Sequence, residues 1–325
     1  HLMRAEVPGP TCGKISSKLS DSAKILYAIY LVMTVIETIL LCAGGMPLFD
    51  ALIHAFGTAG TGGFSNYGAS IAAFHSPLIE WIITFFMVLF GINFALFYRA
   101  ITGDWRDALR SEELHWYLGI YGTATIFSTM LLLPRYHGFW EALRYGSFQV
   151  ASVMSTTGYA TADFNLWPVA VKMVLLLVMI VGGCAGSTAG GIKVVRTALL
   201  FKLGRREIRH TFQPRKVQVV RFEGKGVEEG MLSQVAMFFC VYVLMLLLGA
   251  FAISLEGRFD VETNLTAALT CLSNVGPGLG AVGPVENFAG YGPFAKLVLS
   301  LLMLAGRLEL FPILALFHPA IWRKS

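Results

Sequence analysis

The segment "AFGTAGTGGFS" at residues 55–65 decides the fold, because its pattern occurs twice more in the chain. The segments "VASVMSTTGYA" at residues 150–160 and "ALTCLSNVGPG" at residues 268–278 align with it so that one glycine falls in register. A short amphipathic run of apolar and small residues precedes each of these glycines. Self-similarity of this kind predicts an internally repeated architecture.

Apolar segments lie on both sides of each of these three motifs. Six of them are long enough, or nearly so, to cross the hydrocarbon core of a membrane, which takes about 20 helical residues. We predict spans at residues 24–43, 77–101, 115–133, 167–192, 231–254 and 294–318. Only 14% of the 325 residues are charged, whereas about 25% is usual in soluble domains. The chain is therefore predicted to be an all-α polytopic membrane protein.

The runs before the three glycines are too short to cross a membrane, so we expect them to be re-entrant half-helices followed by non-helical loops. The predicted unit is helix, pore half-helix, loop and helix, three times over. Basic residues follow the second, fourth and sixth spans and precede the first. By the positive-inside rule those segments are cytoplasmic, and the re-entrant loops enter from outside. Binding of nucleic acid or lipid by the basic run at residues 193–225 would not explain this alternation.

Non-helical backbone at membrane depth leaves carbonyl groups that need protein or water around them. A ring of such carbonyls can replace the hydration shell of a potassium ion, and glycine permits the positive φ that aims successive carbonyls one way. The half-helices also direct their partly negative C-terminal ends inward, which favours a cation. The predicted filter residues are Thr61, Gly62, Gly63, Thr156, Thr157, Gly158, Asn274, Val275 and Gly276. Ordinary turn chemistry explains one such loop, but three in register favour a pore.

The segment "GGCAGSTAGGIKVVR" at residues 182–196 follows an apolar run and interrupts it with glycines. Its glycines and its lysine resemble a phosphate-binding loop, which requires the pattern G-x-x-x-x-G-K-[ST]. Here Ile192 precedes Lys193 and Val194 follows it, so the required Lys-Ser/Thr pair is absent. We interpret the segment as a transmembrane helix that unwinds, not as a nucleotide site.

The motifs "TAGTGGFS", "STTGYA" and "NVGPGLG" resemble the pore loops of the Trk/Ktr/HKT superfamily of potassium transport proteins. The segments "AGSTAGGIKVVR" and "RAEVPGP" closely resemble the bacterial TrkH branch. The resemblance covers almost the whole chain and implies four pore units around one pore, of which this sequence holds three. It implies a cytoplasmic connector at residues 1–23, the second unit at 24–110, a unit with a broken inner helix and a basic cytoplasmic segment at 111–230, and the last unit at 231–325. The chain is accordingly expected to be a fragment that lacks the first pore unit.

The resemblance also implies a function and partners. It implies potassium uptake through the bacterial cytoplasmic (inner) membrane by a pore-forming subunit, with potassium at the filter residues as the transported substrate and no cofactor. It implies contact with membrane lipid, a homodimer, and a cytoplasmic nucleotide-binding regulatory subunit of the TrkA type, for which residues 193–225 are a candidate docking surface. No nucleic-acid partner is expected. The predicted gate comprises Gly182, Gly183, Gly186, Ser187, Thr188, Gly190, Gly191 and Arg307.

Arg307 lies within the last predicted span, where a charged side chain costs about 2.5–3.5 kcal/mol or more and is functional by default. The resemblance implies that its partners are carbonyls and hydroxyls of residues 186–190. The alternative is an ion pair with Glu37 or Glu309, although residues two apart do not share a helix face, which disfavours Glu309.

No Ser/His/Asp or Cys/His set can be placed on one face, so we predict that the chain is not an enzyme. The alternative function is a cation-coupled secondary transporter with discontinuous helices. That class predicts two inverted halves, whereas the three units here share one orientation.

Overall fold

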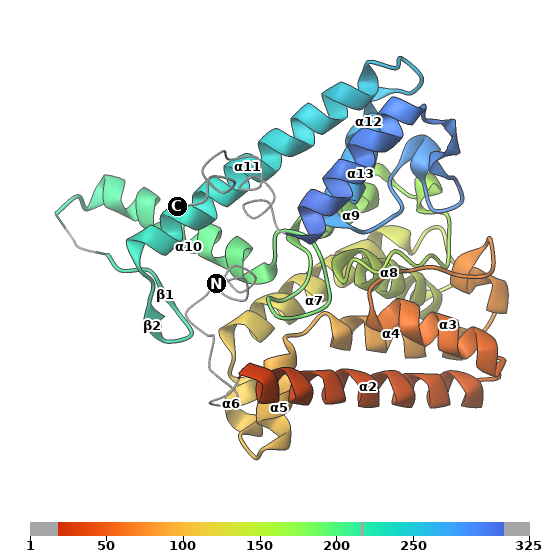
Figure 1. Ribbon diagram of the computed structural model, residues 1–325, viewed down its shortest axis with the longest axis horizontal. Coiled ribbons are helices and arrows are strands. Elements are labelled where there is room, and N and C mark those ends of the chain that lie inside the picture. Colours follow the sequence, from red (N-terminus) through yellow and green to blue (C-terminus); the bar gives the residue numbers. More distant parts are fainter. Residues whose placement is uncertain (1–18, 216–217, 309–325) are drawn as a thin grey trace, which may run out of the picture.

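The computed structural model describes residues 19–215 and 218–308, which form helices joined mostly by short loops (Figure 1). Three groups of helices repeat one order: a long helix, a half-helix and an inner helix. The groups are α2 (Leu19–Ala43), α3 (Leu48–Ala59) and α4 (Pro77–Phe90); α7 (Glu112–Leu132), α8 (Phe139–Met154) and α9 (Val169–Val181); and α11 (Glu229–Ser254), α12 (Val261–Ser273) and α13 (Pro293–Arg307). The helical fold class predicted from the sequence is confirmed.

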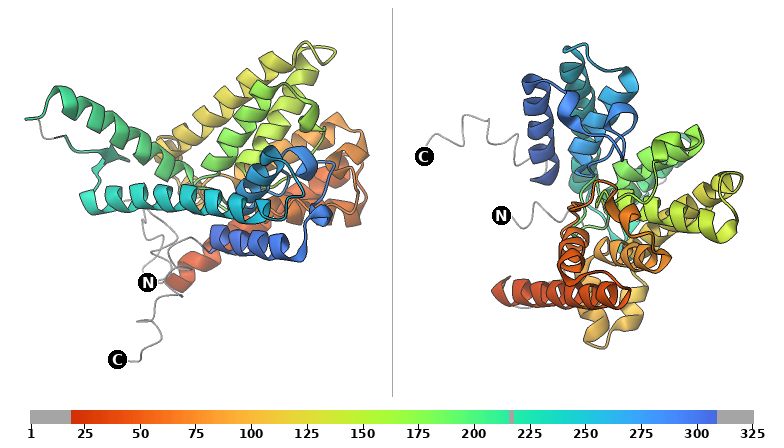
Figure 2. Two further views of the ribbon diagram at one scale, coloured as in Figure 1. Left: turned by 90° about the horizontal axis from the view of Figure 1, so that it is seen from above. Right: turned by 90° about the vertical axis from the view of Figure 1, so that its right-hand side faces the viewer.

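The three groups follow one another around a common centre, as the right-hand view of Figure 2 shows. Within each group all three helices pack on one another, and neighbouring groups meet where α4 contacts α8 and where α9 contacts α12. The half-helices α3, α8 and α12 have 12, 16 and 13 residues. Each is shorter than the about 20 residues that a full crossing takes, so its C-terminal end lies inside the fold.

Two helices of the described residues, Ala23–Ala43 within α2 and Glu229–Ser254, are long and apolar enough to cross a membrane singly. A third candidate is α4 taken together with α5 (Phe94–Ile101), but this pair bends by 92° between Phe90 and Phe94. The prediction of one continuous span over residues 77–101 is therefore wrong. The other predicted spans do not meet this test within the described residues.

Gly91 lies at the break between α4 and α5, and Tyr117 from α7 packs against it. A Cβ atom at Gly91 would overlap the Tyr117 hydroxyl group, which donates to the Val88 carbonyl at 3.1 Å. After the break, the Asn93 side chain accepts from the Ala95 amide at 2.9 Å and caps the new helix. The tyrosine thus occupies the space that a side chain at position 91 would need.

The inner helix α9 ends at Val181, and α10 (Val194–Phe212) begins after an irregular connection. The predicted interruption of this span is therefore present. The last helix described, α13, ends at Arg307, so most of the remainder of the predicted span at 294–318 lies outside the described residues.

The basic segment, which the sequence predicts to be cytoplasmic, consists of α10 and a small hairpin of β1 (Arg221–Phe222) and β2 (Lys225–Gly226), which pair antiparallel. Its turn residues Glu223 and Gly224 both have positive φ, as the favoured two-residue hairpin turn requires. This hairpin was not predicted from the sequence. The remaining short elements are α6 (Trp105–Leu109) and the 3₁₀ turns η1 (Ser70–Phe74), η2 (Phe164–Leu166), η3 (Gly280–Val282) and η4 (Phe288–Gly290).

Candidate functional site

The three half-helices end in the same hydrogen-bonded motif. In each one, an amide just past the helix bonds to a carbonyl five residues earlier, which is the long bond of a Schellman motif. The bonds run from Gly62 to Gly57 at 2.7 Å, from Thr157 to Ser152 at 2.9 Å and from Val275 to Thr270 at 3.0 Å. The three segments that align in the sequence at their glycines therefore also share one backbone conformation.

The first and third residues of each predicted filter triplet have left-handed backbone. The first residues, Thr61, Thr156 and Asn274, have φ of 50°, 58° and 59°. The glycines in third place, Gly63, Gly158 and Gly276, have φ of 65°, 88° and 111°. Glycine adopts this region freely, whereas a β-branched threonine is a genuine outlier there. Such strain persists only where the surroundings hold it, and it concentrates at functional sites.

Adjacent filter loops touch through their glycines. A Cβ atom at Gly63 would overlap the carbonyl oxygen of Thr157, and one at Gly158 would overlap the carbonyl oxygen of Val275. At Gly276 no described atom lies within 4 Å of that position. The middle carbonyls of the second and third triplets therefore each lie against the glycine of a neighbouring loop, and no described atom takes this place beside Gly276.

Two side chains that the sequence reasoning missed tie the loops together. The Tyr159 hydroxyl lies at hydrogen-bond distance from the carbonyls of His54, at 3.1 Å, and Phe64, at 3.3 Å, both in the unit at residues 24–110. Asn165 donates to the carbonyl of Gly280 and accepts from its amide, each at 3.0 Å, which joins the unit at 111–230 to the unit at 231–325. The one signal in the sequence for these contacts was the aromatic residue directly after Gly158, which is Tyr159. Nothing in the sequence indicated that Asn165 would contact another unit.

The predicted gating loop, residues 182–191, lies directly against the filter. Gly182, Gly186 and Gly191 have φ of 73°, 72° and 77°. A Cβ atom at Gly182 would overlap the Gly190 carbonyl, so the two ends of the loop lie against each other. The loop is therefore a compact turn of irregular backbone for which glycine is required at its ends.

The threonines in first place of two filter triplets contact this loop. The Thr61 hydroxyl donates to the Thr188 carbonyl at 3.0 Å, and the Thr156 hydroxyl accepts from the Gly190 amide at 2.6 Å. The equivalent Asn274 lies against the last helix. With its amide oxygen toward α13, it accepts from the Arg307 backbone amide at 3.2 Å. All three equivalent side chains thus join the filter to the predicted gate.

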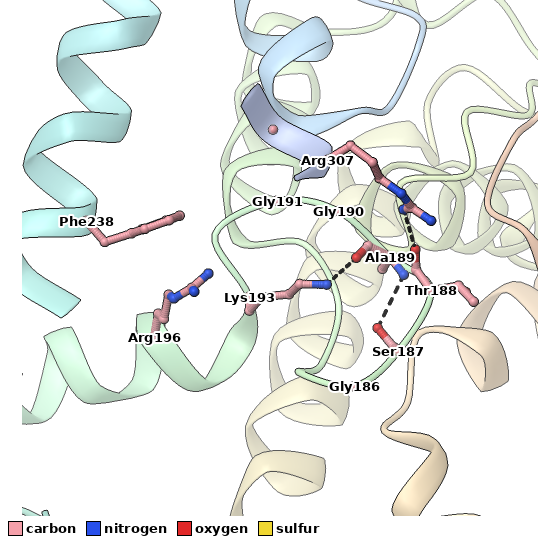
Figure 3. Close-up of a pocket in the computed structure, with 11 residues that line it drawn as sticks. Gly186, Ser187, Thr188, Ala189, Gly190, Gly191, Lys193, Arg196, Phe238 and Arg307 are labelled. Atoms are coloured by element: carbon pink, nitrogen blue, oxygen red, sulfur yellow. Dashed lines mark hydrogen bonds between the residues drawn. The ribbon is translucent and has the colours of Figure 1, made fainter. Parts of the chain in front are cut away.

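Arg307 reaches the loop from the opposite side, as Figure 3 shows, and its Nη1 donates to the Thr188 carbonyl at 2.9 Å. Lys193 donates to the Ala189 carbonyl beside it. A cavity of about 220 Å³ lies here, lined by the loop, Lys193, Arg196, Phe238 and Arg307. The contact predicted between Arg307 and residues 186–190 is present. The alternative partner Glu309 lies outside the described residues.

Comparison with known proteins identifies the family. The model of the TrkH family, a cation transport protein, matches residues 1–134 and 140–324. The chain belongs to the TrkH family. The Trk system potassium uptake protein TrkH of Salmonella typhimurium is 37% identical over 334 residues, which cover 100% of this chain and 67% of the relative. The Trk system potassium uptake protein TrkG of Escherichia coli K12 is 32% identical over 99% of this chain and 67% of its own length.

A solved structure of the TrkH family shows the same fold. The crystal structure of the potassium transporter TrkH from Vibrio parahaemolyticus superposes with a TM-score of 0.90 at 32% sequence identity. The match covers 99% of this chain and 69% of that one. The family resemblance read from the pore-loop motifs is confirmed. The roles of the individual filter and gate residues stay predictions, as do the domain boundaries at 23, 110 and 230.

Within this TrkH-family chain the structure brings the predicted filter and gate residues into one site. In the parts of the chain that the structure describes, no group of three or more His, Cys, Asp and Glu side chains could hold a metal ion. The oxygen atoms that the structure brings together at the site include backbone carbonyls and threonine hydroxyls. Such a set suits a weakly held monovalent cation more than a tightly held divalent one.

Proposed function

We propose that this chain is the pore-forming part of a potassium uptake protein of the bacterial cytoplasmic membrane. One observation carries the proposal: three loops with the same left-handed pattern, two of whose glycines pack on the next loop's middle carbonyl. This packing holds the carbonyls of separate units close together. Carbonyls so placed can substitute for the water around a potassium ion, which is the transported substrate.

The loop beneath the filter is the barrier in this mechanism. Potassium would lose water at the carbonyls and then meet residues 182–191, behind which Lys193 and Arg307 lie. Two positive side chains on the cytoplasmic side repel a cation while the loop stays in place. Conduction therefore requires the loop to move and the bond between Arg307 and the Thr188 carbonyl to break.

The filter assignment is tested by substituting a filter glycine that has no room for a side chain. Gly158→Ala places a Cβ atom where the Val275 carbonyl lies and also strains a φ of 88°. Rubidium and sodium uptake are measured in proteoliposomes that hold the full-length protein. We expect rubidium uptake to fall about tenfold or more, or its preference over sodium to be lost.

The matched control is Gly68→Ala, because Gly68 has negative φ and open space within 4 Å of a Cβ atom. It should leave uptake unchanged. Equal uptake and selectivity in Gly158→Ala and the wild-type protein would overturn the filter assignment.

The proposal extends to partners. We propose a homodimer in membrane lipid, regulated by a nucleotide-binding subunit of the TrkA type that docks on residues 193–225. Support for the homodimer comes from α10, on which the apolar residues Phe201, Ile208 and Phe212 are exposed. The basic side chains along the same helix support docking of the regulator. An apolar stripe on a helix that carries many charges is typical of a surface that a partner covers. No cofactor and no catalytic activity are proposed for this chain.

The alternative, a cation-coupled secondary transporter, is not favoured. Such proteins are built from inverted halves, whereas all three half-helices here end in the same motif and in the same order along the chain. The relatives are named as uptake proteins of the Trk system.

A further inference from the structure

A buried carboxylate contacts the gating loop from the cytoplasmic side, apart from Arg307 and the filter. Glu113 lies in the first turn of α7 and is 4% exposed. Its Oε1 accepts from the Ala185 amide of the loop at 2.6 Å, and its Oε2 lies 3.5 Å from the Asn93 side-chain nitrogen at the α4–α5 break. Burial raises the pKa of Glu113 to about 7, against the opposing effect of the Ala185 amide, and a buried polar group is retained only where it is bonded.

The start of α7 is held in turn by the cytoplasmic hairpin. Oε1 of Glu223, in the hairpin turn, accepts from the Ser111 hydroxyl at 2.8 Å and from the Glu113 amide at 3.2 Å. A carboxylate at a helix N-terminus is stabilised by the free amides and the helix dipole. The Glu223 amide donates back to Glu112 at 3.1 Å, and Glu112 pairs with Lys202 of α10. The contact between the hairpin and α7 is therefore reciprocal.

Apolar packing joins the same two segments. Phe222 of the hairpin is fully buried and belongs to one hydrophobic cluster with Ala185 of the gating loop. The cluster also contains Val195, Ala198 and Leu199 of α10, together with Val220, Val227, Leu232 and Val235. Because packed cores shift as units and do not deform gradually, displacement of the hairpin strains the loop at Ala185.

We propose that Glu113 is a positioning residue for the gating loop, and that Glu223 couples it to the cytoplasmic hairpin at residues 221–226. The hairpin continues the basic segment 193–225, so a regulator bound there acts at the start of this path. The path runs from Glu223 through the first turn of α7 to Glu113 and the Ala185 amide. The effect of this path on ion flux rests on the proposed function, whereas its effect on the position of the gating loop does not.

Cys184 provides a readout of loop position that does not depend on conduction. This thiol is free, is 0% exposed and lies next to Ala185. The rate at which a water-soluble maleimide modifies it in the full-length protein is followed by mass spectrometry of the peptide that contains it. Rubidium influx is measured in parallel on the same proteoliposomes.

Glu113→Ala leaves the buried Ala185 amide without an acceptor, and we expect the modification rate to rise about tenfold. Glu113→Gln keeps an amide oxygen at that place and should restore most of the protection, which also shows that the site still folds. Glu223→Ala should raise the rate by a smaller factor. Because Glu223 acts through Glu113, the double alanine variant should match Glu113→Ala alone.

Lys225→Ala is the matched control, since Lys225 is an exposed side chain of the same hairpin, and it should leave the rate unchanged. An unchanged rate in Glu113→Ala overturns the proposal, as do additive effects in the double variant. A raised rate with unchanged rubidium influx supports the positioning role and instead refutes the gate of the proposed function.

Discussion

At the scale of single residues, the threonines at 61 and 156 are the most informative. Both hold the strained left-handed conformation that glycine would adopt at lower cost. The filter alone does not explain them, because a carbonyl ring uses only backbone atoms. Their hydroxyl groups explain them, since each one bonds to the gating loop.

Thr156→Gly is expected to loosen the contact between the filter and the gating loop, and also to remove the backbone strain at position 156. The substitution removes the acceptor of the Gly190 amide, a bond of about 1 kcal/mol, so rubidium influx should rise about fivefold. Thr156→Ser keeps the hydroxyl and should behave like the wild-type protein. Equal influx in the glycine and serine variants would show that the hydroxyl is not what holds the loop.

Arg307→Ala removes the donor that reaches the Thr188 carbonyl from the cytoplasmic side. Because it also removes a positive charge from the path of a cation, we expect higher rubidium influx and a higher open probability in single-channel recordings. Arg307→Lys retains the charge, so its rubidium influx should lie between those of the wild-type protein and Arg307→Ala. Influx that stays at the wild-type value in Arg307→Ala would contradict the gating role.

At the scale of helices and loops, the turns that are marked by glycines could be predicted from the sequence. Features that depend on contacts between distant segments could not. The three half-helices and their loops could be predicted because Gly63, Gly158 and Gly276 mark the same backbone turn. The interruption after Val181 was visible in its glycines for the same reason. The break at Gly91 could not be predicted, since a single glycine in an apolar run is common and the Tyr117 that occupies its space lies on another helix.

The hairpin and the role of Glu113 were missed for a related reason. Glu113 reads as an ordinary acidic residue in the first turn of a helix, where carboxylates are common. Only the folded chain brings it to the Ala185 amide. A charge inside an apolar span demands a partner, and the family resemblance implied that the partner of Arg307 is the loop.

The N-terminus of α13 depends on a carboxylate in the connection between α11 and α12. The amides of Ala295 and Gly292 bond to Glu256, at 2.9 and 2.7 Å, and hold its pKa below the ordinary value of 4.5. A lowered pKa in the folded state adds stability above pH 4.5, and this is lost as the pH falls through the lowered value.

We therefore expect Glu256→Gln to lower the Tm by a constant amount above pH 5. The difference from the wild-type protein should shrink as the pH falls from 4.5 through the lowered pKa of the folded state, where the wild-type carboxylate becomes protonated too. Thermal unfolding in detergent at several pH values measures this, with Glu286→Gln on an exposed side chain as the control. A Tm difference that does not change with pH would mean that the charge of Glu256 is irrelevant.

At the scale of the whole molecule, α10 carries one of the apolar surfaces that the described fold leaves exposed. Phe201, Ile208 and Phe212 are 61%, 63% and 81% exposed. Their spacing of seven and four residues places them on one face of the helix. A second copy of the chain is the partner that we expect to cover this face in the proposed homodimer.

The double substitution Ile208→Glu and Phe212→Glu should shift the full-length protein from dimer to monomer in detergent. Light scattering coupled to size-exclusion chromatography measures the mass directly. Glu207→Gln, on an exposed side chain of the same helix, is the control and should leave the mass unchanged. A dimer that persists in the double variant would place the interface elsewhere on the molecule.

One oxygen atom, the carbonyl of Thr188, accepts both from the filter threonine at 61 and from Arg307. In the proposed mechanism, this shared atom couples ion binding at the filter to the position of the gating loop. Thermodynamic linkage makes such coupling reciprocal: a bound ion changes the probability of opening by the same factor by which opening changes the affinity for the ion. A pathway built in this way responds to the ion it carries, so its conductance should depend on external potassium even when no regulator is bound.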